Sequence, residues 1–194
     1  MRQLLALKWR LMPLVVAVAV LMIPVAGSVL DHNRAATDAK AAEIILGSRP
    51  RPGSRLQGLP SKIIIPSLSI DLAVVTQHYS PSIKSWPVSP STANYAAETP
   101  LINNTQGQSL IYGHDTRGIF GPLVNLKPGA AAYVYTSDGH VFKYTFTGST
   151  DISPQKIGIV DKMARMPAGL SLITCSGEYF QYRHLMAFRL LQAS

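Results

Sequence analysis

Residues 61–194 are divided into short apolar or alternating runs by turn-forming residues, and this pattern limits the folds open to the chain. Residues 62–75 predict two strands with a break at Pro66, which lacks a backbone donor and fits a sheet edge or a bend. Residues 109–112 predict another short, buried strand. Several short strands with turn signals between them, and little helix, indicate an all-β domain that closes into a mostly antiparallel barrel.

A β-hairpin is predicted around Asp138-Gly139, because this dipeptide between two alternating segments is a strong signal for a two-residue turn. With Ser137 paired to His140, the aromatic side chains of both strands share one face, where each cross-strand pair contributes about 0.2–1 kcal/mol. A slip of one residue would put the two sets of rings on opposite faces. The expected aromatic pairs are Tyr135 with Phe142 and Tyr133 with Tyr144.

Residues 77–100 form a long polar connection that contains Trp86 and three interior prolines. The sequence predicts a loop here, with a single helical turn around residues 91–97. Loops of this length are commonly functional. Two interpretations stay open: the segment helps to shape a substrate groove, or it is a packed connection anchored by Trp86.

Residues 11–30 contain no charged side chain and as a helix would span about 30 Å, the thickness of a bilayer's hydrocarbon core. Arg2, Lys8 and Arg10 precede this run. By the positive-inside rule they predict a single-pass membrane anchor with a cytoplasmic N-terminus and an extracellular domain. The alternative is a cleaved signal peptide, with Val25-Ala26-Gly27 as the cleavage site. Both interpretations export the domain.

The segment between the predicted anchor and the domain is a predicted linker. Its alanine-rich residues 35–46 predict a short helix, and its proline- and glycine-rich residues 47–60 predict a partly extended tether. The net charge of +8 is uneven: residues 1–60 hold eight Lys or Arg against three Asp or Glu, and residues 61–194 hold ten against seven. This asymmetry favours a membrane surface and not nucleic acid as partner. The predicted organisation is a basic cytoplasmic N-terminus (1–10), a transmembrane signal-anchor (11–30), a linker (31–60) and a folded domain (61–194).

Cys175 is the only cysteine of the chain, so it cannot form an internal disulfide. It ends an apolar run that predicts a buried strand. Residues 176–182 predict a loop, and residues 183–191 predict a second strand. If these strands pair antiparallel, Cys175 lies opposite Arg183, with Cβ atoms about 5 Å apart. A guanidinium group beside a thiol favours the thiolate.

Three segments of the chain together resemble the sortases, the cell-surface cysteine transpeptidases. They are Ile63-Ile64-Ile65-Pro66 through Ile70-Asp71, Leu110-Ile111-Tyr112-Gly113-His114, and Leu172-Ile173-Thr174-Cys175 with Tyr182-Arg183. The resemblance covers residues 61–192 and is greatest to classes E and F. The chain departs from the family pattern at Ser171, where threonine is usual. The resemblance implies an eight-stranded sortase-type β-barrel with short helices.

The resemblance also implies three catalytic side chains. Cys175 would attack the Thr–Gly carbonyl of a Leu-Pro-x-Thr-Gly-like (LPxTG-like) sorting signal and form a thioester. Arg183 would hydrogen-bond the substrate or the oxyanion. His114 would protonate the leaving amine and then act as base for an amine acceptor, which is a cell-wall precursor or a protein amine. Thr174 is a further candidate for contact with the substrate or the oxyanion region.

Ordinary pKa values of about 8.5 for a thiol and about 6.5 for imidazole favour the neutral Cys175–His114 pair over the ion pair by about 2.7 kcal/mol. Arg183 favours the thiolate but disfavours imidazolium, so only part of the protein is expected to hold the reactive ion pair. No cofactor or metal is predicted, because Asp151 and Asp161 are too sparse for the calcium site that some sortases carry.

Two other functions stay open on the sequence. One is a cysteine protease of the same fold that hydrolyses the thioester with water. The other is a non-catalytic exported β-barrel that binds a partner and whose thiol is incidental. The Ser-His-Gly-Cys signature of L,D-transpeptidases, another class of cysteine enzyme that acts on the cell wall, is absent.

Overall fold

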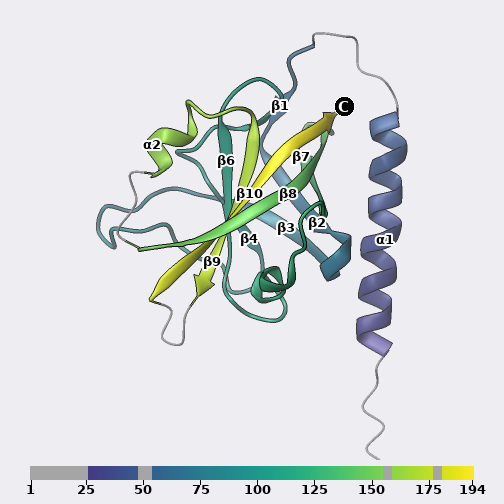
Figure 1. Cartoon of the computed structure of the whole chain (residues 1–194), viewed down its shortest axis with the longest axis horizontal. Coiled ribbons are helices and arrows are strands. Elements are labelled where there is room, and N and C mark those ends of the chain that lie inside the picture. The colour runs from purple at the N-terminus through teal and green to yellow at the C-terminus, as the bar shows by residue number, and fades with distance from the viewer. Residues whose placement is uncertain (1–25, 48–53, 155–158, 177–180) are drawn as a thin grey trace, which may run out of the picture.

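The computed structural model describes residues 26–47, 54–154, 159–176 and 181–194. Within these residues eight strands close into a barrel, which confirms the predicted all-β, mostly antiparallel fold (Figure 1). Around the barrel the strands follow the order β10 (Tyr182–Ala193), β8 (Val141–Ile152), β7 (Ala131–Thr136), β2 (Pro60–Ile65), β3 (Ile70–Gln77), β4 (Ala93–Ala96), β6 (Gln108–Tyr112) and β9 (Gly169–Ser176).

Shorter elements surround this barrel. The predicted break at Pro66 is a 3-10 turn, η1, after which Ser69 takes a left-handed φ of 54° and donates its N–H to the Pro66 carbonyl at 3.1 Å. Proline suits this place because its fixed φ fits the first turn of a helix. The surrounding elements are α1 (Ala26–Gly47), β1 (Gln57–Gly58), η1 (Pro66–Leu68), β5 (Ile102–Asn103), η2 (Gly121–Asn125) and α2 (Ile159–Met163).

Two pairs of neighbouring barrel strands run parallel in the described structure, β3 with β4 and β6 with β9. The helical turn predicted around residues 91–97 is wrong, because this segment forms β4. Tyr95 is buried in the barrel core, while Ala96 is buried in a small cluster outside the barrel. A strand covered on both faces lacks the alternation of polar and apolar residues that marks a half-buried strand in the sequence.

The predicted hairpin around Asp138-Gly139 is present, but its register differs from the prediction. Thr136 donates its N–H to the His140 carbonyl at 3.0 Å, and the Thr136 hydroxyl accepts the His140 N–H at 3.0 Å. The turn therefore contains the three residues 137–139. Gly139 supplies the positive φ, 91°, that the last residue of such a turn requires. The resulting pairs are Tyr135 with Val141, Val134 with Phe142, and Tyr133 with Lys143.

This register makes the predicted aromatic ladder wrong, because the rings divide between the two faces of the barrel wall. Phe142 and Tyr144 lie in the barrel core, whereas Tyr133 and Tyr135 lie outside, beneath α1. Most buried tyrosine hydroxyls have a hydrogen-bond partner. The outer face supplies both partners from α1: the Glu43 carboxylate for Tyr133 at 2.5 Å, and the Asp38 carbonyl for Tyr135 at 2.8 Å.

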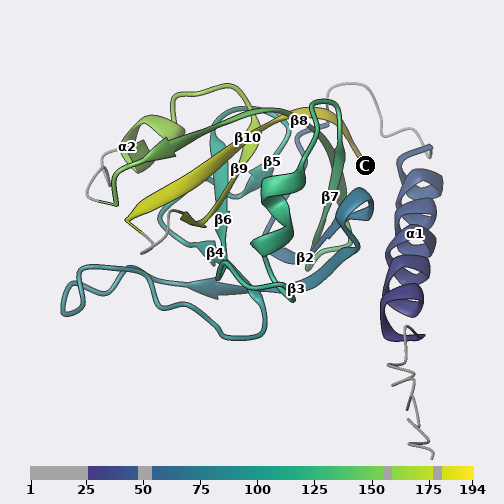
Figure 2. The same ribbon diagram turned by 60° about the horizontal axis from the view of Figure 1, so that its bottom comes forward.

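Helix α1 includes the predicted helix at residues 35–46 but begins earlier, and it lies along the barrel wall (Figures 1 and 2). Its buried residues recur at helical spacing, so one stripe of the helix covers the barrel. This stripe consists of Ala35, Ala39, Ala42 and Leu46 and contacts Ile64, Tyr133 and Val141. Three of its four residues are alanines, which let the helix approach the wall closely.

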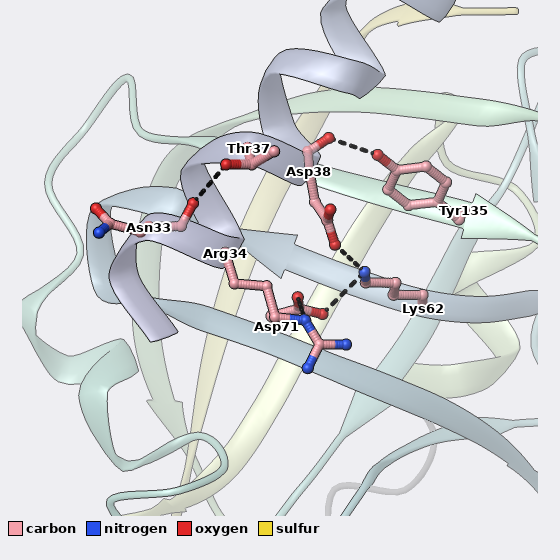
Figure 3. Close-up of polar contacts among 7 residues, drawn as sticks. All are labelled: Asn33, Arg34, Thr37, Asp38, Lys62, Asp71 and Tyr135. Atoms are coloured by element: carbon pink, nitrogen blue, oxygen red, sulfur yellow. Dashed lines mark hydrogen bonds and ion pairs between the residues drawn. The ribbon is translucent and has the colours of Figure 1, made fainter. Parts of the chain in front are cut away.

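Ion pairs link the first half of α1 to β2 and β3 (Figure 3). The Lys62 ammonium on β2 lies between the carboxylates of Asp38 on α1 and Asp71 on β3, with 3.2 Å to Asp71. Arg34 Nε lies 3.3 Å from the same Asp71 carboxylate. The pKa of Asp38 is lowered, chiefly because Lys62 donates a hydrogen bond to its carboxylate.

The second half of α1 is tied to β7, β8 and the C-terminal residues. The Glu43 carboxylate accepts hydrogen bonds from Lys143 and from Tyr133, and these bonds lower the pKa of Glu43. Gln192 and Ser194 donate hydrogen bonds to carbonyls in the last turn of the helix. In the described part, the residues next to the predicted anchor therefore pack against the barrel.

Among the described residues, no helix has both the length and the apolar character needed to cross a membrane. The predicted anchor at residues 11–30 lies mostly outside the described residues and stays a prediction, as do the domain boundaries.

We expect Asp71→Ala to lower the free energy of unfolding by about 2 kcal/mol, because it leaves the partly buried Lys62 with a single carboxylate and removes the partner of Arg34. Chemical denaturation of the full chain in detergent measures the change. Asp161→Ala, which removes an exposed carboxylate on α2, is the control and should change stability by less than about 0.5 kcal/mol. Equal stability of the two variants would contradict the role given to Asp71.

Candidate active site

Cys175 lies near the end of β9 and faces the outside of the barrel wall. Side chains alternate along a strand, and Leu170 and Leu172 are buried in the barrel core. Ile173 and Cys175 therefore project to the other face, where Ile173 packs against a small cluster outside the barrel. The thiol is partly buried and is not in a disulfide.

Arg183 lies opposite Cys175, as predicted from the sequence. β10 pairs antiparallel with β9, and its register sets Arg183 directly across from Cys175 and Tyr182 across from Ser176. The Arg183 Nη1 donates a hydrogen bond to the Tyr182 carbonyl at 3.1 Å. The loop predicted between the two strands lies mostly outside the described residues. Strand pairing thus sets the Cβ atoms of Arg183 and Cys175 beside each other.

His114 reaches the same place through the parallel pairing of β6 with β9. The register pairs Tyr112 with Ile173, and the Gly113 N–H continues it by donating to the Ile173 carbonyl at 3.1 Å. β6 ends at Tyr112, and two residues further along each segment come His114 and Cys175, which line the same cavity. Two residues restore the side-chain direction of a strand, so the parallel register accounts for the meeting of these two residues.

Gly113 is required because the chain passes closely over the residues that precede η2. A Cβ atom added to Gly113 would lie 2.8 Å from Ile119 Cγ2 and 3.1 Å from the Phe120 ring. Ile119 and Phe120 are buried in the barrel core. The His114 carbonyl also accepts the Phe120 N–H at 3.1 Å, which fixes the backbone of the histidine.

Thr174, the further candidate of the sequence analysis, also borders the site, but its hydroxyl has a structural partner. The side chain is 5% exposed, and its Oγ1 donates a hydrogen bond to the Gly113 carbonyl at 3.0 Å. The bond links the residue before Cys175 to the residue before His114. Thr174 therefore holds together the two backbone segments that carry the thiol and the imidazole.

Cys175, His114 and Arg183 line one cavity of about 210 Å³. Its apolar lining also includes residues outside the sequence motifs, among them Trp86 in the β3–β4 connection, Ile152 at the end of β8 and Val160 on α2. The β3–β4 connection borders the cavity, and its Trp86 packs against Tyr79 and Tyr112. The helix α2 had no clear signal, because it is a single short turn within a proline-bounded connection.

The charges around the cavity are of one sign. Within the described residues, its lining includes the cations Lys84 and Arg183 and no carboxylate. No group of three or more His, Cys, Asp or Glu side chains suited to a metal ion occurs in the part of the chain that the structure describes.

Comparison with known proteins identifies the family. The profile of the sortase domain matches residues 63–190, and the chain belongs to the sortase family. A comparison with curated protein sequences gave no match.

Solved structures of sortases share the fold at low sequence identity. Sortase E1 from Streptomyces coelicolor, solved with a tripeptide in its active site, is 22% identical with a TM-score of 0.57, over 71% of this chain and 90% of that one. Sortase A from Listeria monocytogenes is 19% identical with a TM-score of 0.55, over the same shares. Sortase C-3 from Streptococcus pneumoniae is 20% identical with a TM-score of 0.54, over 85% of each chain.

We expect Thr174→Val to lower the free energy of unfolding by about 1–2 kcal/mol, because it deprives the buried Gly113 carbonyl of its hydroxyl donor. Thr174→Ser keeps the hydroxyl and should recover most of this loss. Thermal and chemical denaturation of the full chain measure both variants. If the serine variant were no more stable than the valine variant, the hydroxyl bond would not be the stabilising feature.

Proposed function

We propose that this protein is a membrane-anchored cysteine transpeptidase that cleaves an LPxTG-like sorting signal between Thr and Gly and joins the threonine carbonyl to an amine. Sortases in general act on sorting signals and amine acceptors. The observation that carries the proposal for this chain is the common cavity of Cys175, His114 and Arg183, which come from three separate strands or strand ends.

In the first half of the reaction, the Cys175 thiolate attacks the carbonyl carbon of the scissile Thr–Gly bond. Arg183 donates hydrogen bonds to the oxygen, on which negative charge develops, and its planar fork of donors suits this task. His114, as imidazolium, protonates the glycine nitrogen as the C–N bond breaks. The products are a thioester on Cys175 and a free amine that leaves.

In the second half, an acceptor amine attacks the thioester carbonyl. Neutral His114 removes a proton from this amine, the C–S bond breaks, and Cys175 leaves as a thiolate. Atoms and charge return to the starting state, so no cofactor is consumed. The acceptor is a cell-wall precursor or a protein amine on the envelope.

The predicted anchor at residues 11–30 supports a place at the cell membrane, with the N-terminus in the cytoplasm and the barrel outside. A sorting signal and an envelope amine both lie on that side of the membrane. The strand order supports the same assignment of roles, because β9, which carries Cys175, lies between β10, which carries Arg183, and β6, which leads to His114.

We expect Cys175→Ala to abolish turnover and to leave the fold intact, because it removes the nucleophile and only one partly buried sulfur atom. The full chain in detergent is incubated with a Leu-Pro-Ala-Thr-Gly peptide and triglycine, and the products are separated by mass spectrometry. Transfer to triglycine supports the transpeptidase. Cleavage without transfer would instead identify a protease of the same fold. No turnover by the unaltered chain, together with a thiol that resists alkylation, would indicate a non-catalytic binding domain.

We expect Arg183→Lys to reduce kcat/KM by at least about a hundredfold, because a lysine ammonium cannot present two parallel donors to the oxyanion. Arg189→Lys on the same strand, remote from the cavity lining, is the matched control and should keep ordinary rates. Steady-state kinetics with the same peptide compare the two variants. Equal rates for Arg183→Lys and the unaltered chain would remove Arg183 from the mechanism.

A further inference from the structure

The connection between β3 and β4 extends from the barrel as a long loop and returns to border the active-site cavity (Figure 2). At its tip, Ser80 and Ser85 exchange two backbone hydrogen bonds, Ser80 N–H to Ser85 O at 2.9 Å and Ser85 N–H to Ser80 O at 3.3 Å. Lys84 has a positive φ of 50° in this turn. The turn leads directly into Trp86, which lines the cavity together with Lys84.

The Glu98 carboxylate ties both arms of this loop to one point. Its Oε1 accepts the backbone N–H of Tyr79, on the outgoing arm, at 2.9 Å. Its Oε2 accepts the indole N–H of Trp86, on the returning arm, at 2.5 Å. The Tyr79 ring packs edge-on against the Trp86 ring, with 5.1 Å between centroids. Glu98 follows β4 by two residues, so its backbone is held by the barrel.

The pKa of Glu98 favours the charged carboxylate that accepts these two hydrogen bonds. Burial alone would raise this pKa, but hydrogen bonds from Trp86, from Tyr79 and from the backbone of Glu98 itself, together with the nearby His78, lower it. His78 Nδ1 lies 3.6 Å from Glu98 Oε1 and adds a further favourable charge when it is protonated. Charge-assisted hydrogen bonds of this kind are stronger than neutral ones.

The returning arm contacts β6, the strand that ends two residues before His114. The Tyr112 hydroxyl donates to the Pro87 carbonyl at 2.7 Å, and the Trp86 ring lies 6.4 Å from the Tyr112 ring between centroids. Burial raises the pKa of Tyr112, so its hydroxyl stays a donor. One further bond, from the Ser89 N–H to the Asn94 side chain at 3.0 Å, fixes the end of the arm. The indole is thus held as a wall of the cavity.

From these contacts we propose that Glu98 is a positioning residue, which clamps the β3–β4 loop so that Trp86 forms an apolar wall for an extended peptide substrate. The inference rests on the proposed function for the identity of the peptide. Glu98 is not in the cavity lining and acts through Trp86. Its loss therefore affects how tightly the peptide binds, and the chemistry at Cys175 is left unchanged.

The test follows the clamp and the binding separately. Trp9→Phe removes the only other tryptophan of the chain, so the emission of the full-length protein in detergent reports on Trp86 alone. Glu98→Ala should shift this emission to longer wavelength and increase its quenching by acrylamide. In the same protein carrying Cys175→Ala, the Leu-Pro-Ala-Thr-Gly peptide should bind about tenfold more weakly with Glu98→Ala than without it. Glu98→Gln keeps an acceptor oxygen and should recover at least part of both effects.

Two controls separate the clamp from a loss of stability. Glu43→Ala removes a carboxylate that, like Glu98, accepts two hydrogen bonds, but that lies on α1 and outside the cavity lining. It should leave Trp86 emission and peptide affinity within about twofold. With Cys175 present, the alkylation rate of this only thiol and kcat should stay within about twofold in Glu98→Ala, while KM rises about tenfold.

Unchanged Trp86 emission in Glu98→Ala overturns the clamp, and so does equal loss of peptide affinity in the Glu98→Ala and Glu43→Ala variants. Failure of the unaltered chain to bind or process the peptide is a failure of the proposed function. In that case the emission and quenching of Trp86 still decide the clamp, because they need no substrate.

Discussion

The parallel pairing of β6 with β9 is the constraint on which the rest of the site depends. A parallel pair keeps a constant offset between the two strands, and the register that joins Tyr112 to Ile173 leads on to His114 and Cys175. The chain between these strands contains the β7–β8 hairpin and α2, so the two residues meet only when this large crossover has been built. The approach of the thiol and the imidazole therefore depends on closure of the barrel. Arg183 joins them through the simpler antiparallel pairing of β10 with β9.

The two faces of β9 serve this geometry together. Cys175 points outward into the cavity, and the preceding Thr174 points inward and donates its hydroxyl to the Gly113 carbonyl. Gly113 in turn lies against Ile119 and Phe120, where no side chain would fit. The backbone before His114 is thus held by a hydrogen bond on one side and by the barrel core on the other. A site of this kind needs no long side-chain network, because most of its positioning comes from the backbone.

The sequence predicted those features that depend on strand ends and short motifs. Cys175 and Arg183 could be set opposite each other because a short loop joins two clear strands, and His114 follows a recognisable Gly-containing strand end. The prediction of the hairpin register was wrong because the hydroxyl of Thr136, and not the Asp-Gly pair alone, sets the length of the turn. The strand β4 was not predicted because it pairs with segments distant in the sequence, β3 and β6, and because both of its faces are buried. The clamp at Glu98 had no signal in the sequence, since it depends on the path of a long loop.

The order of strands around the barrel also separates the attachment of α1 from most of the active-site cavity. α1 contacts β2, β3, β7 and the first residues of β8, and the cavity is built on β6, β9, β10 and the last residue of β8, with α2 and the loop before β4. Between them lies the core that fills the barrel, in which side chains from both halves interdigitate. Close-packed cores deform little, so we expect changes in the contacts of α1 to have little effect on the distances among Cys175, His114 and Arg183. If α1 continues toward a membrane, the barrel is fixed to that helix by Lys62 and Asp71 (Figure 3) and by Glu43, and none of these three residues lines the cavity.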